Sequence, residues 1–236
     1  MKFLRNVVLG ITACCLSFGI ADSQKNKPKG ANIPPEPWTS VHTRDAFIDR
    51  IGEDGFYCRL PAPALVVADT PLFGEYEKVT DTIVTPDWSQ LTPDERAIFI
   101  ELSADKSDKS AQDVFEMEAH DWIMIVETVR WWENCKQLSL KLTPYQAEVQ
   151  AVRVALAYWK ETSEDDVLAK LNDIWAKLEN EPSLVPSGQD FPTYFNQHYQ
   201  KNSSGKDYLW MQAQVVKAVK AEQPELGVVQ GMKKLE

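Results

Sequence analysis

Apolar residues along the second half of the chain recur at the spacing of amphipathic helices. One stripe, at positions i, i+1, i+4, i+7, i+8 and i+11, consists of Val167, Leu168, Leu171, Ile174, Trp175 and Leu178. An earlier stripe of the same period consists of Tyr145, Val149, Val152, Leu156 and Trp159. No glycine interrupts the chain between Gly74 and Gly188. This period predicts helices that each bury one face.

Capping sequences mark where these helices begin. Leu-Thr-Pro occurs at residues 91–93 and again at 142–144, and a Glu or Gln follows each threonine by three positions. That arrangement is a capping box with proline at the first helical position. Ser163 precedes an acidic first turn, which the helix dipole favours. We expect a last helix over 206–222 and an aromatic-rich short helix or turn over 191–202.

Residues 39–91 have a different pattern, in which proline and glycine separate short apolar segments. A brief helix is expected from Thr43, which would cap it, to Gly52, which would stop it. Three further segments have the composition of strands. These are residues 56–60, 64–69 and 81–85.

These patterns predict one mostly α-helical domain over residues 39–236. Residues 92–222 would form an antiparallel array of about five helices with short connections. Residues 39–91 would form an irregular layer against the array, with room for short strands, and residues 223–236 a tail. A chain of this length is expected to form one domain rather than two.

The first 21 residues have the organisation of a secretory signal peptide. Lys2 and Arg5 form a basic start, a run without charge continues to Ile20, and small residues precede Asp22. The run is shorter than the about 20 residues that cross a bilayer as a helix. Cleavage before Asp22 would place the protein in the periplasm or outside the cell. The alternative is that residues 1–21 form a buried helix of the fold.

A second processing route is open. Residues 11–14, Ile-Thr-Ala-Cys, resemble the lipobox of bacterial lipoproteins, which would leave a lipidated Cys14 and a membrane anchor. Residues 22–38 hold four prolines and three lysines but almost no aliphatic side chains. Such a composition is typical of a disordered or extended tether.

The acidity of the chain excludes one class of partner. It has 35 Asp and Glu against 25 Lys and Arg, for a formal net charge of −10. Loss of residues 1–21 would remove Lys2 and Arg5 and no acid, which takes −10 to −12. Nucleic-acid binding needs clustered basic residues, so we do not expect it.

Two of the four cysteines, Cys58 and Cys135, lie beyond the signal peptide. In an oxidising compartment such a pair predicts one disulfide. It would close a long loop and contribute about 4 kcal/mol in the chain-entropy model. The alternative is two separately buried thiols.

Residues 111–138 predict the longest helix, whose polar residues are candidates for a site. At 3.6 residues per turn, Glu116, His120 and Glu127 share one stripe, opposite the apolar stripe. We expect water to bathe the polar stripe. The alternative is a metal site, but di-metal bundles use Glu-x-x-His pairs, whereas this spacing is Glu-x-x-x-His without a second copy. No metal and no other cofactor is therefore favoured.

Glu118 departs from this division, because it falls in the middle of the apolar stripe. A carboxylate desolvated beside aromatic rings would have a raised pKa and could act as a general acid. The alternative is an ion pair with an Arg or Lys of a neighbouring helix.

The chain is also rich in tryptophan and tyrosine. Trp131, Tyr199 and Trp210 are candidates for an exposed aromatic patch that binds a glycan or a protein. The alternative is that these rings fill the core.

Motifs of common enzymes are missing from the sequence. It contains no Gly-x-Ser-x-Gly, no glycine-rich phosphate loop and no Cys-x-x-Cys. We therefore expect an exported, acidic, helical binding protein of the bacterial envelope: an inhibitor, an immunity-type protein or an assembly factor. Its partner would be another envelope or secreted protein, and it would reach the membrane only through a lipid anchor. The alternative is an envelope enzyme, for example a hydrolase, that uses Glu118 or the group of Glu116, His120 and Glu127.

Overall fold

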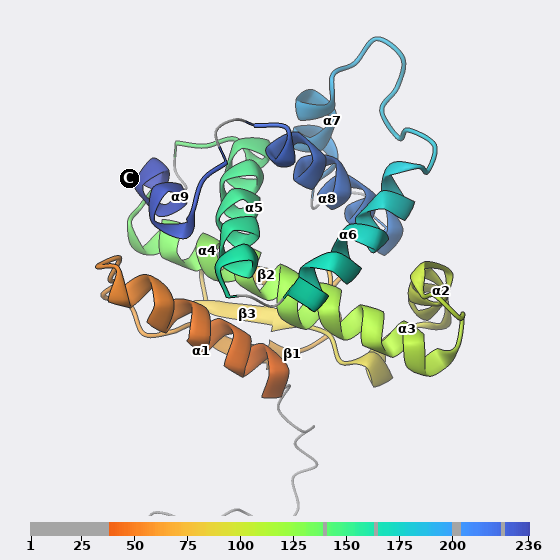
Figure 1. Cartoon of the computed structure of the whole chain (residues 1–236), viewed down its shortest axis with the longest axis horizontal. Helices are drawn as coiled ribbons and strands as arrows, with labels where there is room; N and C mark the ends of the chain where they lie inside the picture. Colours follow the sequence, from red (N-terminus) through yellow and green to blue (C-terminus); the bar gives the residue numbers. More distant parts are fainter. Residues whose placement is uncertain (1–37, 139–140, 163–164, 200–203, 223–224) are drawn as a thin grey trace, which may run out of the picture. The chain divides into compact units, whose positions relative to one another are not determined.

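The computed structural model describes residues 38–138, 141–162, 165–199, 204–222 and 225–236. Within them the chain forms eight helices, with the continuous helix over residues 108–135 counted once although it carries two of the nine labels, and one small three-stranded sheet (Figure 1). The prediction of a mostly helical protein is confirmed, but five helices were too few. The signal peptide, Cys14, the tether before Trp38 and the Ser163 cap lie outside the described residues.

The longest helix is continuous but changes its winding. It begins as α3 (Asp108–Phe115), continues as a π-helix (Glu116–Ile123) and ends as α4 (Met124–Cys135). In the π-helical segment the hydrogen bonds run from i to i+5, so each turn contains an additional residue. Side chains beyond this segment therefore point in directions that a regular α-helix would not give them.

This long helix is covered on several sides. Its α4 part contacts α1 (Trp38–Glu53), α5 (Pro144–Glu161) and the sheet, and its π-helical segment contacts α1 and α6 (Asp165–Glu179). Every residue from 122 to 129 is consequently buried. The expected solvent-facing polar stripe is wrong for the middle of this helix, because neighbouring elements pack around it.

The sheet consists of β1 (Ala64–Val67), β2 (Glu75–Glu77) and β3 (Thr82–Thr85), with β3 in the middle. β3 pairs parallel with β1 and antiparallel with β2. Two of the three expected strands are therefore confirmed. Residues 56–60 are not a strand, and β2 was not expected because Glu-Tyr-Glu has no apolar pattern.

Helix α1 is longer than the sequence suggested. It starts at Trp38 rather than at Thr43, and it ends at Glu53, one residue after Gly52. Thr43 does not cap the helix. Its hydroxyl instead donates a hydrogen bond to Asp121 Oδ1 at 3.1 Å and so ties α1 to the π-helical segment.

The capping boxes of α2 (Pro93–Leu102) and α5 are both present as predicted. The C-terminal residues, expected as a tail, instead form a helix whose apolar residues pack on α5. In these residues the apolar positions follow a helical period, so the sequence did carry the signal. The remaining helices are α7 (Phe191–His198), α8 (Gly205–Lys220) and α9 (Val228–Leu235).

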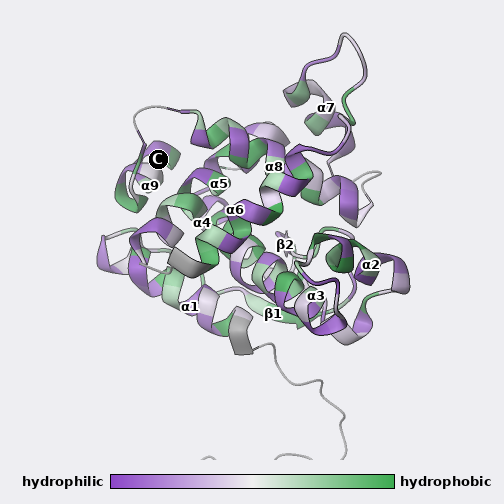
Figure 2. Ribbon diagram, turned by 45° about the vertical axis from the view of Figure 1, so that its right-hand side comes forward, coloured by the Kyte–Doolittle hydropathy of each residue, from purple (hydrophilic) through white to green (hydrophobic). Residues whose placement is uncertain are grey.

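Helices α1, α2 and α3 each carry both hydrophobic and hydrophilic residues along their length (Figure 2). Aromatic rings fill much of the core between the helices. Trp122 of the long helix meets Trp175 of α6 edge to face, with ring centroids 4.6 Å apart. None of the described helices is long and apolar enough to cross a bilayer.

The predicted disulfide is confirmed. Cys58, in the loop before β1, is bonded to Cys135 at the end of α4. The bond holds the segment that leads into the sheet against the C-terminal end of the long helix. Near it, Trp132 Nε1 donates to the carbonyl oxygen of Phe56 at 3.1 Å, which fixes the same two segments together.

Candidate functional site

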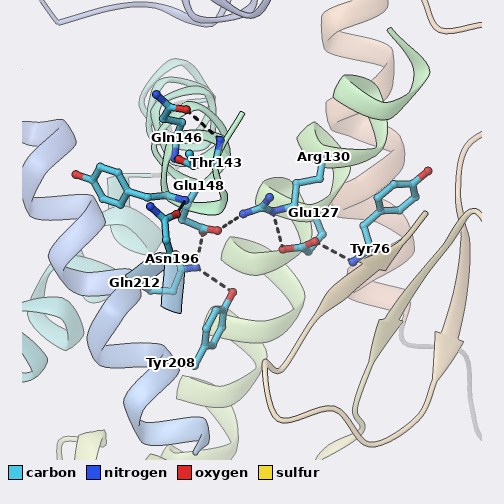
Figure 3. A network of polar contacts seen from close by, with 10 residues as sticks. Tyr76, Glu127, Arg130, Thr143, Gln146, Glu148, Asn196, Tyr208 and Gln212 are labelled. Atoms are coloured by element: carbon cyan, nitrogen blue, oxygen red, sulfur yellow. Dashed lines mark hydrogen bonds and ion pairs between the residues drawn. The ribbon is translucent and has the colours of Figure 1, made fainter. Parts of the chain in front are cut away.

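A cluster of charged and polar side chains lies buried where α4, α5 and α8 meet (Figure 3). Arg130 of α4 lies at its centre and donates through Nη2 to Glu148 Oε2 of α5. Gln212 of α8 donates to the other oxygen of Glu148 and lies 2.9 Å from the hydroxyl oxygen of Tyr208. Both oxygens of the fully buried Glu148 are therefore engaged.

Glu127 lies on the opposite side of the Arg130 guanidinium (Figure 3). Its Oε2 accepts a hydrogen bond from the backbone N–H of Tyr76 in β2 at 2.8 Å. Its Oε1 lies 3.4 Å from Arg130 Nε, but neither of these two atoms has a hydrogen-bond partner among the described residues. Glu133 follows Arg130 by three residues and is 1% exposed. Its Oε1 also has no hydrogen-bond partner among the described residues.

These side chains border a cavity of about 140 Å³. We call it the carboxylate pocket. It is lined by Glu75, Tyr76, Lys78, Glu127, Arg130, Glu133, Asn134 and Tyr199. The lining combines three acids, two bases and two phenol rings, contributed by β2, the residue after β2, α4 and the residue after α7.

The long helix places the acids of the pocket. Glu127, Arg130 and Glu133 follow one another at intervals of three residues, which keeps them near one face of a helix. That face is turned inward, toward β2 and α5, because the preceding π-helical segment shifts the winding. Asn134 Nδ2 donates a hydrogen bond to the hydroxyl oxygen of Tyr76 at 2.9 Å, which connects α4 with β2 a second time.

Burial changes the acidity of these groups. It raises the pKa of Glu127 to about 8, which Arg130 partly offsets and Glu148 reinforces. Burial likewise raises the pKa of Glu133 to about 7, again against the opposing effect of Arg130. Glu127, Glu133 and Glu148 share the single guanidinium of Arg130. One positive charge is too little to offset the free-energy cost of ionising three buried carboxyl groups.

The expected metal-site residues are not gathered in one place. His120 is 2% exposed, and its Nδ1 contacts the carboxylate of Glu116 while its Nε2 donates to the carbonyl oxygen of Pro86 at 3.0 Å. Glu127 points into the carboxylate pocket instead. No group of three metal-ligating side chains occurs within the part of the chain that the structure describes. The expectation that water bathes His120 and Glu127 is wrong, since both are buried.

Glu118 is buried as its position on the apolar stripe implied, with 1% of its surface exposed. Neither oxygen has a hydrogen-bond partner among the described residues, and the indole N–H of Trp175 lies nearby but outside hydrogen-bonding geometry. Burial raises the pKa of Glu118 to about 8, and Trp175 lowers it only in part. Glu118 does not line the carboxylate pocket.

The three aromatic candidates do not form an exposed patch. Trp131, Tyr199 and Trp210 are all buried, so the expectation of a surface aromatic patch is wrong. The alternative of core packing holds for both tryptophans. Tyr199 also lines the carboxylate pocket, and the centre of its ring lies 5.5 Å from the guanidinium carbon of Arg130.

Most residues of the pocket could not be recognised from the sequence. Arg130, Glu133 and Glu148 were not singled out, although Glu148 lies one turn before Val152 of an apolar stripe and so carried a signal of burial. The contribution of Tyr76 had no signal in the sequence, whereas Gln212 shares one face of its helix with Leu209, Val216 and Val219. Tyr76 and Gln212 reach the cluster only through the packing of β2 and α8 on the long helix.

The structure has a second cavity that is larger than the carboxylate pocket. It encloses about 570 Å³ between α3, α6 and the end of α2. Its lining has no buried polar side-chain atom that lacks a partner in the described part of the chain. The lining residues are Leu102, Ala104, Ser110, Asp113, Val114, Met117, Lys170, Asp173, Ile174, Ala176 and Lys177.

Comparison with protein-family models, with curated proteins and with solved structures found no match for this chain. The function is therefore argued from the chemistry of the site. The carboxylate pocket is the candidate, because a cavity there meets buried charged groups with unused hydrogen-bonding capacity.

Proposed function

We propose that this protein is an exported binding protein of the bacterial envelope that holds a small polar group in the carboxylate pocket. One observation carries the proposal: the cavity is bordered by the buried side chains of Glu127 and Glu133. Glu133 Oε1 has no hydrogen-bond partner among the described residues, and Glu127 Oε1 has only the 3.4 Å ion pair with Arg130 Nε. A buried acceptor left unpaired costs about 1–3 kcal/mol, and more when it is charged. A ligand that donates to these oxygens would remove that cost.

Export forms part of the proposal. The sequence of residues 1–21 favours it, and the disulfide between Cys58 and Cys135 supports it because such bonds persist in oxidising compartments. The protein would then act in the periplasm or outside the cell, or on a membrane through a lipid on Cys14. Its partner would be another envelope or secreted protein, as an inhibitor, an immunity-type protein or an assembly factor would have.

One observation favours an enzyme as the second candidate. The pKa values of Glu127 and Glu133, about 8 and about 7, lie near neutral pH, where a carboxyl group can both give and take a proton. Both groups face the same cavity. Glu118 has a similar pKa but lines neither this pocket nor the larger cavity, so it would not meet a substrate in either.

A fragment screen tests the proposed function. The processed chain, with its disulfide intact, is exposed to a library of small polar compounds, and binding is followed by ligand-observed NMR. The same screen is run on Glu133→Gln, which keeps the shape of the side chain but removes its charge. Glu118→Gln is the matched control, because it changes a carboxyl group that is equally buried on the same helix but lies away from the pocket.

We expect a set of compounds that bind the wild type and Glu118→Gln but are weakened by Glu133→Gln. The proposal fails if no compound shows this dependence. Binding compounds are then followed over time by NMR. Chemical conversion that stops in Glu133→Gln, in place of simple binding, would make the enzyme the correct alternative.

A further inference from the structure

We infer that the carboxylate pocket recognises an alkylammonium group. This inference rests on the proposed function and names the ligand class of the same site. Three features of the pocket carry it: the kind of hydrogen bonds it leaves unused, its balance of charges and its size.

The unused hydrogen-bonding capacity consists mainly of acceptors. Glu133 Oε1 lacks a hydrogen-bond partner among the described residues, and Glu127 Oε1 has only the 3.4 Å ion pair with Arg130 Nε. An ionised carboxylate only accepts hydrogen bonds, so the ligand has to donate. An ammonium group carries three N–H donors and no acceptor, so it matches a lining of carboxylates.

The charge of the site also favours a cation. Glu75, Glu127 and Glu133 line the pocket together with Lys78 and Arg130, and Glu148 lies directly behind Arg130. Four acids thus face two bases. One of these bases, Arg130, already donates to Glu148, and its guanidinium carbon lies 5.5 Å from the centre of the Tyr199 ring. A ligand with a positive charge would reduce the repulsion among these four acids.

The size of the cavity limits the ligand. An engineered cavity of about 150 Å³ in another protein accommodates benzene, so about 140 Å³ suits a ligand of roughly six non-hydrogen atoms. A metal ion fits less well, because it seeks more oxygen ligands than Glu127 and Glu133 provide. A short alkylamine or the end of a lysine side chain has both the length and the charge.

Two sources can supply this chemistry. One is a free small amine, and the other is a lysine side chain of a partner protein. Both present the same alkylammonium group to Glu127 and Glu133. The difference lies in what surrounds that group, since a lysine in a polypeptide also brings backbone amides on either side.

Isothermal titration calorimetry of the processed chain at pH 9 tests the inference, because Glu127 and Glu133 are largely ionised there while an alkylamine keeps its charge. The probes are n-butylamine, 1-butanol, butyrate and the lysine derivative Nα-acetyl-lysine methylamide. The proteins are the wild type, Glu127→Gln, Glu133→Gln and the control Glu118→Gln. Circular dichroism verifies that each variant folds, and if one pocket variant does not fold, the other is used.

We expect the two amine probes to bind with one site, and the alcohol and butyrate not to bind. Each pocket substitution should weaken amine binding at least about tenfold, and Glu118→Gln should change it less than about twofold. Tighter binding of the lysine derivative than of butylamine would identify a partner's lysine as the source, and the reverse order a free amine.

The remaining outcomes overturn the inference. Amine binding that Glu127→Gln and Glu133→Gln leave unchanged would place the amine elsewhere on the protein. Binding of the alcohol or of butyrate that depends on Glu133, without binding of the amines, would refute the ligand class but leave the proposed function standing. If no probe binds and the fragment screen finds no compound sensitive to Glu133→Gln, the proposed function fails as well.

Discussion

At the scale of single residues, the unusual feature of this protein is the number of acids buried in its core. Glu118, Glu127 and Glu133 are each at most 2% exposed, and burial raises their pKa values to about 8, about 8 and about 7. Between pH 4.5 and 8 the folded protein therefore holds protons that the unfolded chain has lost. Stability should fall as the pH rises through this window, because the folded state binds more protons than the unfolded state.

Glu118→Gln tests this relation at one position. Trp175 lies beside Glu118, whose carboxyl group has no hydrogen-bond partner among the described residues. At pH 9 the substitution should increase the free energy of unfolding by about 4–5 kcal/mol, because it removes a desolvated charge. At pH 4.5 the two proteins should be nearly equally stable. Urea denaturation at both pH values measures the difference, and a destabilised Glu118→Gln at pH 9 would show that the carboxylate has a stabilising partner.

Burial of individual residues was partly predictable. Glu118 occupies the apolar stripe of the helix, and the sequence pattern alone indicated that it is buried. For His120 and Glu127 the same projection indicated exposure. It failed because it assumed a regular α-helix with a single buried face, whereas this helix contains a π-helical segment and is packed on several sides.

At the scale of elements, the position of β2 against the long helix depends on a glycine. A Cβ atom at Gly74, which directly precedes β2, would lie 2.5 Å from Cγ2 of Ile123 at the end of the π-helical segment. This close approach brings the backbone N–H of Tyr76 to Glu127 Oε2. Gly74 is therefore part of the geometry of the carboxylate pocket, although it does not line it.

Gly74→Ala should destabilise the protein by about 1–3 kcal/mol, because the added methyl group forces β2 and Ile123 apart. Gly52→Ala is the matched control: its Cβ would meet Tyr57 at an ordinary 3.8 Å, and alanine favours the helix in which Gly52 lies. Urea denaturation compares both with the wild type. Equal stability of Gly74→Ala and the wild type would mean that β2 does not pack against Ile123 as described.

The residues at which helices begin were the most predictable part of the fold. Thr92 and Thr143 cap their helices as the local sequence indicated, because a capping box is complete within four residues. β2 and the extent of α1 could not be predicted in this way. They depend on contacts with distant residues, such as the hydrogen bond from Thr43 to Asp121.

At the scale of the whole molecule, one covalent bond links segments that are far apart in the sequence. The disulfide joins Cys58 and Cys135 across 77 positions, and Cys135 directly follows two residues of the carboxylate pocket, Glu133 and Asn134. In the chain-entropy model a loop of this length stabilises the folded state by about 4 kcal/mol. The bond therefore contributes a large part of the stability expected of a single domain.

Replacement of both cysteines, Cys58→Ser with Cys135→Ser, should lower the free energy of unfolding by about 4 kcal/mol. Urea denaturation of the oxidised wild type and of the double variant measures this. Dithiothreitol is the control, since it should destabilise the wild type to a similar extent and leave the double variant unaffected. A reducing agent without effect on the wild type would contradict the presence of the disulfide.

The candidate site could not be predicted as a whole from the sequence. Its side chains come from positions 76, 127, 130, 148 and 212, on a strand and three different helices. No local motif connects them, and charged residues at such positions look like ordinary surface residues. Only the folded structure shows that Arg130 lies between Glu127 and Glu148 and that a cavity adjoins them (Figure 3).

The most direct test of amine binding in the carboxylate pocket is a crystal structure of the processed chain grown with n-butylamine at pH 9. We expect electron density for the amine in the carboxylate pocket, with its nitrogen about 2.7–3.2 Å from Glu133 Oε1. The same crystals of Glu133→Gln should show the pocket without the amine. A wild-type pocket that contains only water, or that is closed by a rearranged Glu133, would contradict the proposed binding of the amine.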